Sequence, residues 1–349
     1  MIVNALGGLE NPNLALARPQ GDNLVDSSMP DVDARAIRDT HAAGVTAVNV
    51  TLGYVGGADE PFEYTIRTIG VWDAILRRYA GDLVKVYTAA DILAAEKSGK
   101  IGIIYGFQNG AMMGADPSRA DIFADLGVRV IQLTYNPANQ IGHGCMSVDD
   151  TGLSPFGHEV VERLNASRIM VDLSHSGTRT CLDAARASAS PISINHTGCR
   201  ALTDLPRNKS DEELRLVASK GGFVGIYFMP FLKPDGQARA EDVVAHIDHA
   251  VDVCGEDHVG IGTDGSATPI DDLGAYGAFL AKQVEDRRKS GLGATGERAD
   301  SYPFVVDLRG VEQFRKLSRL LKARGYPEAR IEKILGLNFL RFARDVWGE

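Results

Sequence analysis

The sequence predicts a (β/α)8 barrel, a TIM-like α/β fold, as a single domain over residues 1–349. Short runs that are apolar throughout alternate with amphipathic stretches, and eight such units fit into the chain. Strands without a polar face are buried on both sides, as in a parallel sheet covered by helices. Eight units over this length favour a closed barrel over an open, doubly wound sheet.

The expected strands are rich in β-branched residues and are bounded by Gly, Asn or Asp, as strands commonly are. They lie at residues 1–5, 45–51, 101–106, 128–134, 168–173, 191–195, 222–228 and 258–263. A further run, LVKVYT at 83–88, could be a ninth strand and leaves the strand count open.

Amphipathic stretches between the runs predict the helices. Examples are DARAIRDTHAAG (33–44), GHEVVERLNAS (157–167) and DEELRLVASKGG (211–222), in which apolar residues recur every three or four positions. The segment 284–303 is polar and interrupts this alternation. We expect it to form a long surface loop or lid.

Composition and charge limit the kinds of binding partner that we expect. The formal net charge is −9 and the isoelectric point is about 5.4, which argues against nucleic acid or an anionic membrane as the main partner. The N-terminus lacks the basic and apolar regions of an export signal, and no run is long enough to cross a bilayer. Four cysteines without CxxC spacing predict reduced thiols, and together these features predict a cytoplasmic protein.

Polar side chains follow several of the expected strands. His175 follows the run ending in VDLS, His196 lies in ISINHTG, Asp264 ends VGIGTDG and Gln108 follows IIYGF. The C-terminal strand ends of a TIM barrel carry its chemistry, so we expect these groups to converge. Two histidines with an oxygen ligand are the elements of a hydrolytic metal site.

Structural roles are the alternative for each of these residues. The two histidines could simply be hydrogen-bonded, and Asp264 could cap a following helix. His246, which lies on a helical pattern (VVAHIDHAV), is expected at the surface.

Six segments together resemble the membrane (renal) dipeptidase family: DTGLSPFGHEVVERLN, VDLSHSG, INHTGCRAL, LPRNKSDEELRLV, VGIGTDG and ILGLNFLRF. The resemblance implies a (β/α)8 barrel of the metal-dependent hydrolase type, often dimeric, that hydrolyses dipeptides with two zinc ions. It also implies that His175 and His196 are ligands of one zinc, that Asp264 is the acid/base and that Arg207 contacts substrate.

Three elements of the family pattern are changed. Ala5, Leu6, Gly7 and Gly8 stand where relatives have a His-x-Asp metal-binding sequence. Gln108 replaces the glutamate that bridges the two zincs, and Tyr135 replaces a histidine thought to stabilise the oxyanion. Aliphatic residues and glycine cannot bind a metal, and an amide oxygen is a weaker zinc ligand than a carboxylate.

We therefore expect a metallodipeptidase-like hydrolase with one zinc ion, held by His175, His196 and Gln108, or with no metal. Its substrate is expected to be a dipeptide or another small amide that carries a carboxylate, with further hydrogen bonds from Tyr135 and Tyr227. The alternative is a family member, without hydrolytic activity or without metal, that binds a small carboxylate or transfers protons. A homodimer is expected from the resemblance.

Overall fold

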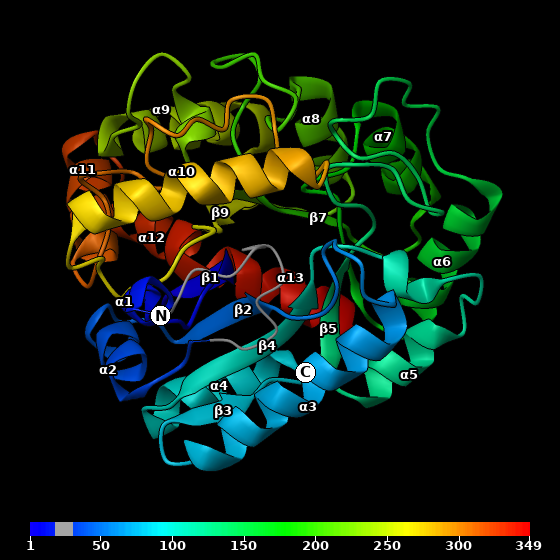
Figure 1. The fold of residues 1–349 in the computed structure, drawn as a ribbon, viewed down its shortest axis with the longest axis horizontal. Helices are drawn as coiled ribbons and strands as arrows, with labels where there is room; N and C mark the ends of the chain where they lie inside the picture. The colour runs from blue at the N-terminus through cyan, green and yellow to red at the C-terminus, as the bar shows by residue number, and fades with distance from the viewer. Residues whose placement is uncertain (18–30) are drawn as a thin grey trace.

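The computed structural model describes residues 1–17 and 31–349. Within these residues, nine parallel strands form one sheet in the order β1-β2-β4-β5-β6-β7-β8-β9, with β3 paired to β4 outside this path (Figure 1). The strands are β1 (Val3–Gly7), β2 (Ala47–Thr51), β3 (Leu83–Lys85), β4 (Ile101–Phe107), β5 (Val128–Gln132), β6 (Met170–Asp172), β7 (Ser193–Thr197), β8 (Phe223–Ile226) and β9 (Val259–Ile261).

The first and last strands meet and nearly close the sheet into a barrel. The backbone N–H of Asp264, just after β9, donates to the carbonyl of Leu6 in β1 at 3.0 Å. The N–H of Gly8 donates to the carbonyl of Gly265 at 3.1 Å. The predicted barrel is confirmed, with a strand at each of the eight expected runs. The ninth run forms β3, which pairs only with β4 and so is not part of the barrel.

Helices follow the strands along the chain. They are α1 (Pro12–Ala17), α2 (Ala34–Ala42), α3 (Pro61–Arg78), α4 (Ala89–Ser98), α5 (Arg119–Asp125), α6 (Pro155–Ala166), α7 (Thr178–Ala187), α8 (Asp211–Ser219), α9 (Ala240–Cys254), α10 (Leu273–Lys289), α11 (Gln313–Ala323), α12 (Glu328–Glu332) and α13 (Asn338–Trp347). Polar side chains start the three helices predicted above: Asp33, Ser154 and Ser210 each accept a backbone N–H of the first turn.

Two expectations need correction. Residues 284–289 are not part of a loop, because they continue α10 to Lys289; the irregular segment begins at 290. His246 is not at the surface: its side chain is buried, and its Nδ1 accepts the backbone N–H of Cys199 at 2.9 Å. His246 thus lies on the inner face of α9 and serves as a buried hydrogen-bond acceptor. Burial lowers its pKa to about 4, which keeps the imidazole neutral and able to accept.

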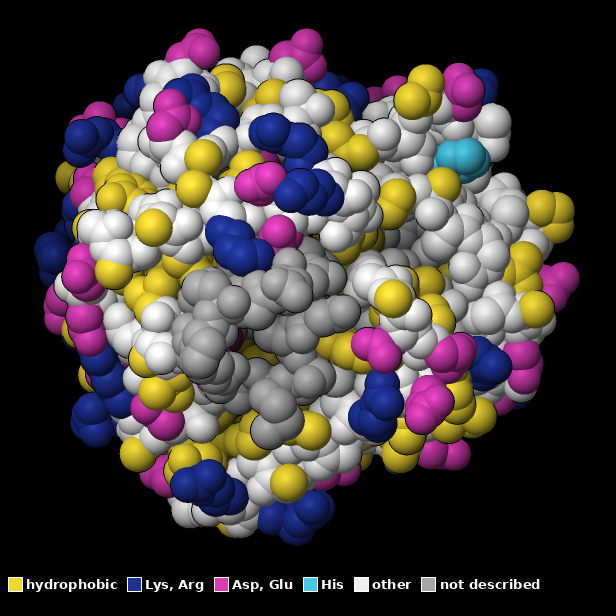
Figure 2. All heavy atoms as spheres, in the orientation of Figure 1, with side chains coloured by type: hydrophobic (Ala, Val, Ile, Leu, Met, Phe, Trp, Pro, Cys, Tyr) yellow, Lys and Arg dark blue, Asp and Glu magenta, His cyan; other side chains and the backbone are white. Residues whose placement is uncertain are grey.

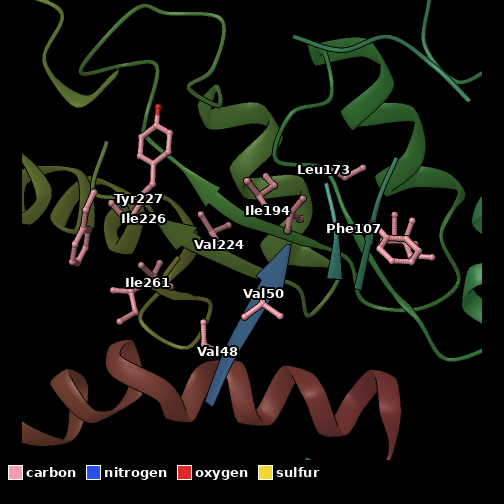
Figure 3. Packing of buried hydrophobic residues seen from close by; sticks show 14 of the residues in the cluster. Val48, Val50, Phe107, Leu173, Ile194, Val224, Ile226, Tyr227 and Ile261 are labelled. Carbon is pink, nitrogen blue, oxygen red and sulfur yellow. The ribbon is translucent and has the colours of Figure 1, made fainter. Parts of the chain in front are cut away.

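Two clusters of apolar side chains form the core. The larger one fills the space around the sheet and includes Val48 and Val50 of β2 and Val224 of β8 (Figure 3). The second joins the first residues of several strands to the aromatic face of α13, with Val3, Ala47, Met170 and Phe223 against Phe339, Phe342 and Trp347. Helix α13 therefore covers the N-terminal ends of the strands, which leaves the C-terminal ends for the site.

The surface carries charges of both signs. On the face shown in Figure 2, acidic and basic side chains of the described residues are interspersed. No helix in residues 1–17 and 31–349 is both long enough and apolar enough to span a bilayer.

Candidate active site

Two buried histidines meet at the C-terminal ends of β6 and β7. The Nε2 atoms of His175 and His196 lie 3.0 Å apart. Asp172 holds the two strand ends in place, because its Oδ1 accepts the backbone N–H groups of Ser174 and Asn195, each at 3.0 Å. The Ser174 hydroxyl donates to Asp172 and accepts the backbone N–H of His196 at 3.1 Å. The sequence-predicted pair is thus brought together by a buried carboxylate.

The hydrogen bonds of Asn136 determine which imidazole nitrogens carry a proton. Its Nδ2 donates to the carbonyl of Leu292 at 2.8 Å, so its oxygen is the atom that faces Nδ1 of His175 at 2.7 Å. An amide oxygen only accepts, so Nδ1 of His175 is protonated and its Nε2 accepts from Nε2–H of His196. Nδ1 of His196 is then an unprotonated acceptor, buried and without a hydrogen-bond partner among the described residues.

The surroundings keep both imidazoles neutral. Burial lowers the pKa of His175 and of His196 well below the ordinary range, and the positive charges of Arg207 and Lys209 lower it further. Neutral imidazole is the form that binds a metal. Within the described parts of the chain, however, no three His, Cys, Asp or Glu side chains are grouped so that they could hold an ion.

A cavity of about 390 Å³ opens beside His175. Its walls combine residues after the strands with α10 and the segment that follows α10. The polar residues that line it include Glu10, Gln108, Tyr135, Asn136, His175, Arg207, Asp264 and Arg287. His196 lies behind His175 and is completely buried.

Asp264 has the features expected of a reacting group. It adopts a left-handed backbone conformation with φ of 56°, which a residue other than glycine rarely adopts outside constrained sites. Burial raises the pKa of its carboxyl to about 6, although the charges of Arg207 and Arg287 oppose the rise. The following helix, α10, is capped by Asp272, so Asp264 is not a helix cap.

Arg207 is buried against the histidine loop. Only 1% of it is exposed, and its Nη1 donates to the carbonyl of Ser174 at 2.7 Å. Its guanidinium carbon lies 5.7 Å from the centroid of the Tyr227 ring. Among the described residues, no carboxylate lies within ion-pair distance of this guanidinium.

Tyr227 does not reach the cavity. The residue is completely buried within the larger apolar cluster (Figure 3), and its hydroxyl donates to Oδ1 of Asn208. Its hydroxyl thus already has a partner in the core, and its ring lies behind Arg207. A hydrogen bond from Tyr227 to substrate stays a prediction. A tyrosine at a strand end can point to either face, and the sequence does not distinguish the two.

Tyr135 lies over His175, with ring centroids 4.3 Å apart and an interplanar angle of 26°. Its hydroxyl accepts from Nη2 of Arg287 at 3.2 Å, and Arg287 also forms an ion pair with Glu297 at 2.8 Å. Arg287 is a site residue that the sequence pattern did not indicate, because it lies in the polar segment that was expected to be a loop. The only available signal was a basic residue within that segment.

Gln108 lines the cavity at the end of β4. Its side-chain Nε2 donates to Oγ1 of Thr51 at 2.7 Å, and its backbone carbonyl accepts from Nε2 of Gln132 at 2.6 Å. The side-chain amide is thus held by Thr51 of β2, with its nitrogen turned to that residue.

Comparison with known proteins identifies the family of this chain. The model of the membrane dipeptidase family (peptidase family M19) matches residues 10–290. The chain belongs to this family. The match begins after β1. Because the chain belongs to this dipeptidase family, it is a hydrolase by class. The family generally depends on metal.

Several relatives of this dipeptidase-family chain are known. An uncharacterized protein in the pqqA 5′ region of Klebsiella pneumoniae is 25% identical over 82% of the chain and 98% of that protein. An uncharacterized dipeptidase of Schizosaccharomyces pombe is 33% identical over 63% of the chain, which spans 56% of the yeast protein. The crystal structure of an amidohydrolase from Pseudomonas aeruginosa aligns over 100% of this chain and 97% of that one, with a TM-score of 0.82 and 31% identity.

Proposed function

We propose that this family member hydrolyses a small amide, such as a dipeptide, that carries a free carboxylate. The observation that carries this proposal is Arg207, which is buried at the cavity wall and has no carboxylate partner among the described residues. A buried cation without a carboxylate at ion-pair distance is costly, and a substrate carboxylate would compensate for it. The charge of Arg287 is already balanced by Glu297, so Arg207 is the better anchor.

Asp264 is the proposed acid/base. Its pKa of about 6 lies close to neutral pH, where a general base works best. In the proposed step, the Asp264 carboxylate takes a proton from water as the water oxygen attacks the amide carbon. Tyr135, held by Arg287, is proposed to donate a hydrogen bond to the oxygen of the attacked carbonyl.

The residues do not fit the two-ion centre of complete family members, because β1 supplies no ligand and no three-residue ligand group occurs among the described residues. They fit one ion at most, which His175 and His196 would hold with Gln108 as the expected third ligand. When bound, such an ion would polarise a carbonyl or lower the pKa of a water molecule. The positive charges of Arg207 and Lys209 weaken this site.

The test is a panel of amides offered to the purified protein, with and without added zinc. L-Ala-L-Ala, L-Ala-D-Ala and N-acetyl-L-alanine are each compared with the same compound blocked as a C-terminal amide. Hydrolysis confined to the free carboxylates, and lost in Arg207→Met, supports the proposal. Equal cleavage of the blocked compounds would overturn the role of Arg207.

The alternative is a member that binds a small carboxylate without hydrolysing it. The direct hydrogen bond between His175 and His196 favours it, because the two Nε2 atoms are then satisfied by each other without a metal. Calorimetric binding of the free dipeptides without any turnover would support this alternative over hydrolysis.

A homodimer and a cytoplasmic location stay predictions. The four cysteines are free thiols, which fits a reducing compartment. Light scattering of the purified chain tests the dimer.

A further inference from the structure

The carboxyl group of Glu10 occupies the space beside Gly8 in which a side chain would otherwise lie. A Cβ atom built on Gly8 would collide with both carboxyl oxygens of Glu10, far inside van der Waals contact. Only glycine at this position leaves room for the carboxyl. The Glu10 side chain therefore folds back over the end of β1.

This position brings Glu10 to the strand junction that holds Asp264. The backbone N–H of Gly8 donates to the carbonyl of Gly265, and the backbone N–H of Asp264 donates to the carbonyl of Leu6. The ends of β1 and β9 are therefore hydrogen-bonded at this point. Both Glu10 and Asp264 line the same cavity. Three carboxyl-bearing residues therefore line the cavity, and Glu297, unlike Glu10 and Asp264, is paired with Arg287.

The charges around Glu10 favour its protonated form. Burial is the main cause that raises its pKa to about 7, and the negative charges of Asp264 and Asp31 raise it further, against hydrogen bonds from backbone N–H groups. Among the described residues, no side chain donates a hydrogen bond to its carboxyl. Asp264, in contrast, is close to the positive charges of Arg207 and Arg287, which favour its ionised form.

We propose that Glu10 is a second catalytic group of this site, a carboxylic acid that protonates the leaving nitrogen while Asp264 removes a proton from the attacking water. The inference rests on the proposed hydrolysis. The water oxygen forms a bond to the amide carbon, and one water proton goes to Asp264. The carbon–nitrogen bond breaks, and the nitrogen receives the Glu10 proton. Transfer of the proton from Asp264 to Glu10 then restores both groups, and the net reaction consumes one water.

This assignment predicts a bell-shaped pH dependence of kcat. The active form has Asp264 ionised and Glu10 protonated, so activity falls at acidic pH and again at alkaline pH. The charged groups that influence Glu10 are Asp264 and Asp31. Those that influence Asp264 are Arg207, Arg287 and Glu297.

The first experiment needs no substrate. Infrared spectroscopy follows the protonated carboxyl absorption between pH 5 and 9 (a range set about the two pKa values). We expect a component that disappears as pH rises through neutrality in the parent and is absent from Glu10→Gln. Gly8→Ala should also remove it, because the new methyl group displaces the carboxyl. Gly265→Ala is the matched control, since its Cβ meets nothing within 4 Å. A parent spectrum without this component overturns the proposal.

The second experiment measures turnover of the best compound from the panel above. Glu10→Gln should lower kcat by about 10²-fold or more and remove the alkaline limb of the pH profile. Glu162→Gln, an exposed glutamate on α6, controls for loss of one charge. Turnover that Asp264→Asn abolishes and Glu10→Gln leaves intact overturns the role of Glu10 alone. If the parent hydrolyses none of the compounds, the proposed hydrolysis and the role of Glu10 both fall.

Discussion

Replacement of Asp264 by Asn tests whether the residue acts as a proton acceptor or only has a structural role. The two side chains have nearly the same shape, and both tolerate the left-handed backbone that Asp264 adopts with φ of 56°. Asn cannot ionise, so it can neither accept the water proton nor carry the partly buried charge. We expect Asp264→Asn to lower turnover by about 10²-fold or more.

The same substitution should stabilise the protein at alkaline pH. Burial raises the Asp264 pKa from 3.8 to about 6, and each pKa unit is worth about 1.4 kcal/mol, so ionised Asp264 costs about 3 kcal/mol in the folded state. The folded state holds this proton more tightly than the unfolded state, so stability falls as pH rises from 3.8 to 6. For a chain of 349 residues, recovery of this free energy raises Tm by about 4 °C.

Thermal unfolding at pH 4 and pH 8 checks this expectation, with turnover measured on the same preparations. Asp264→Asn should melt higher than the parent at pH 8 and nearly equal to it at pH 4. Asp125→Asn, an exposed residue at the end of α5, provides the matched control at both pH values. An unchanged Tm at pH 8 would show that Asp264 is not desolvated, and a folded variant with parental turnover would refute its role as acid/base.

Three further outcomes are expected. Elemental analysis should find at most one zinc per chain, and none in His175→Ala; two tightly held ions would contradict the loss of ligands from β1. Tyr135→Phe should keep the ring on His175 but lose the hydroxyl, and we expect kcat to fall about 10-fold or more with little change in Tm, as for a lost oxyanion donor. Lys209→Met should destabilise the protein by about 3–5 kcal/mol in chemical denaturation, because Glu213 is completely buried and would lose its ion-pair partner at 3.2 Å; an equally stable variant would contradict this.

The alternation of strands and helices could be predicted from local patterns. Apolar runs and three- to four-residue spacing depend on neighbours in the sequence, and all eight barrel strands lie where these patterns indicate. The convergence of His175 and His196 also followed, because parallel strands end at one edge of the barrel. Gly8 showed that a family ligand was missing, but nothing in the sequence indicated what would fill its place.

The tertiary structure decided how the groups are protonated and which of them reach the cavity. The proton on His175 depends on Asn136, 39 residues away in another loop, and the orientation of Tyr135 depends on Arg287, 152 residues further along the chain. Tyr227 has its hydroxyl bound to Asn208 in the core, although its sequence position resembles that of a site residue. Hydrogen-bond partners and desolvation arise from contacts between distant segments, and local sequence patterns do not contain those distances.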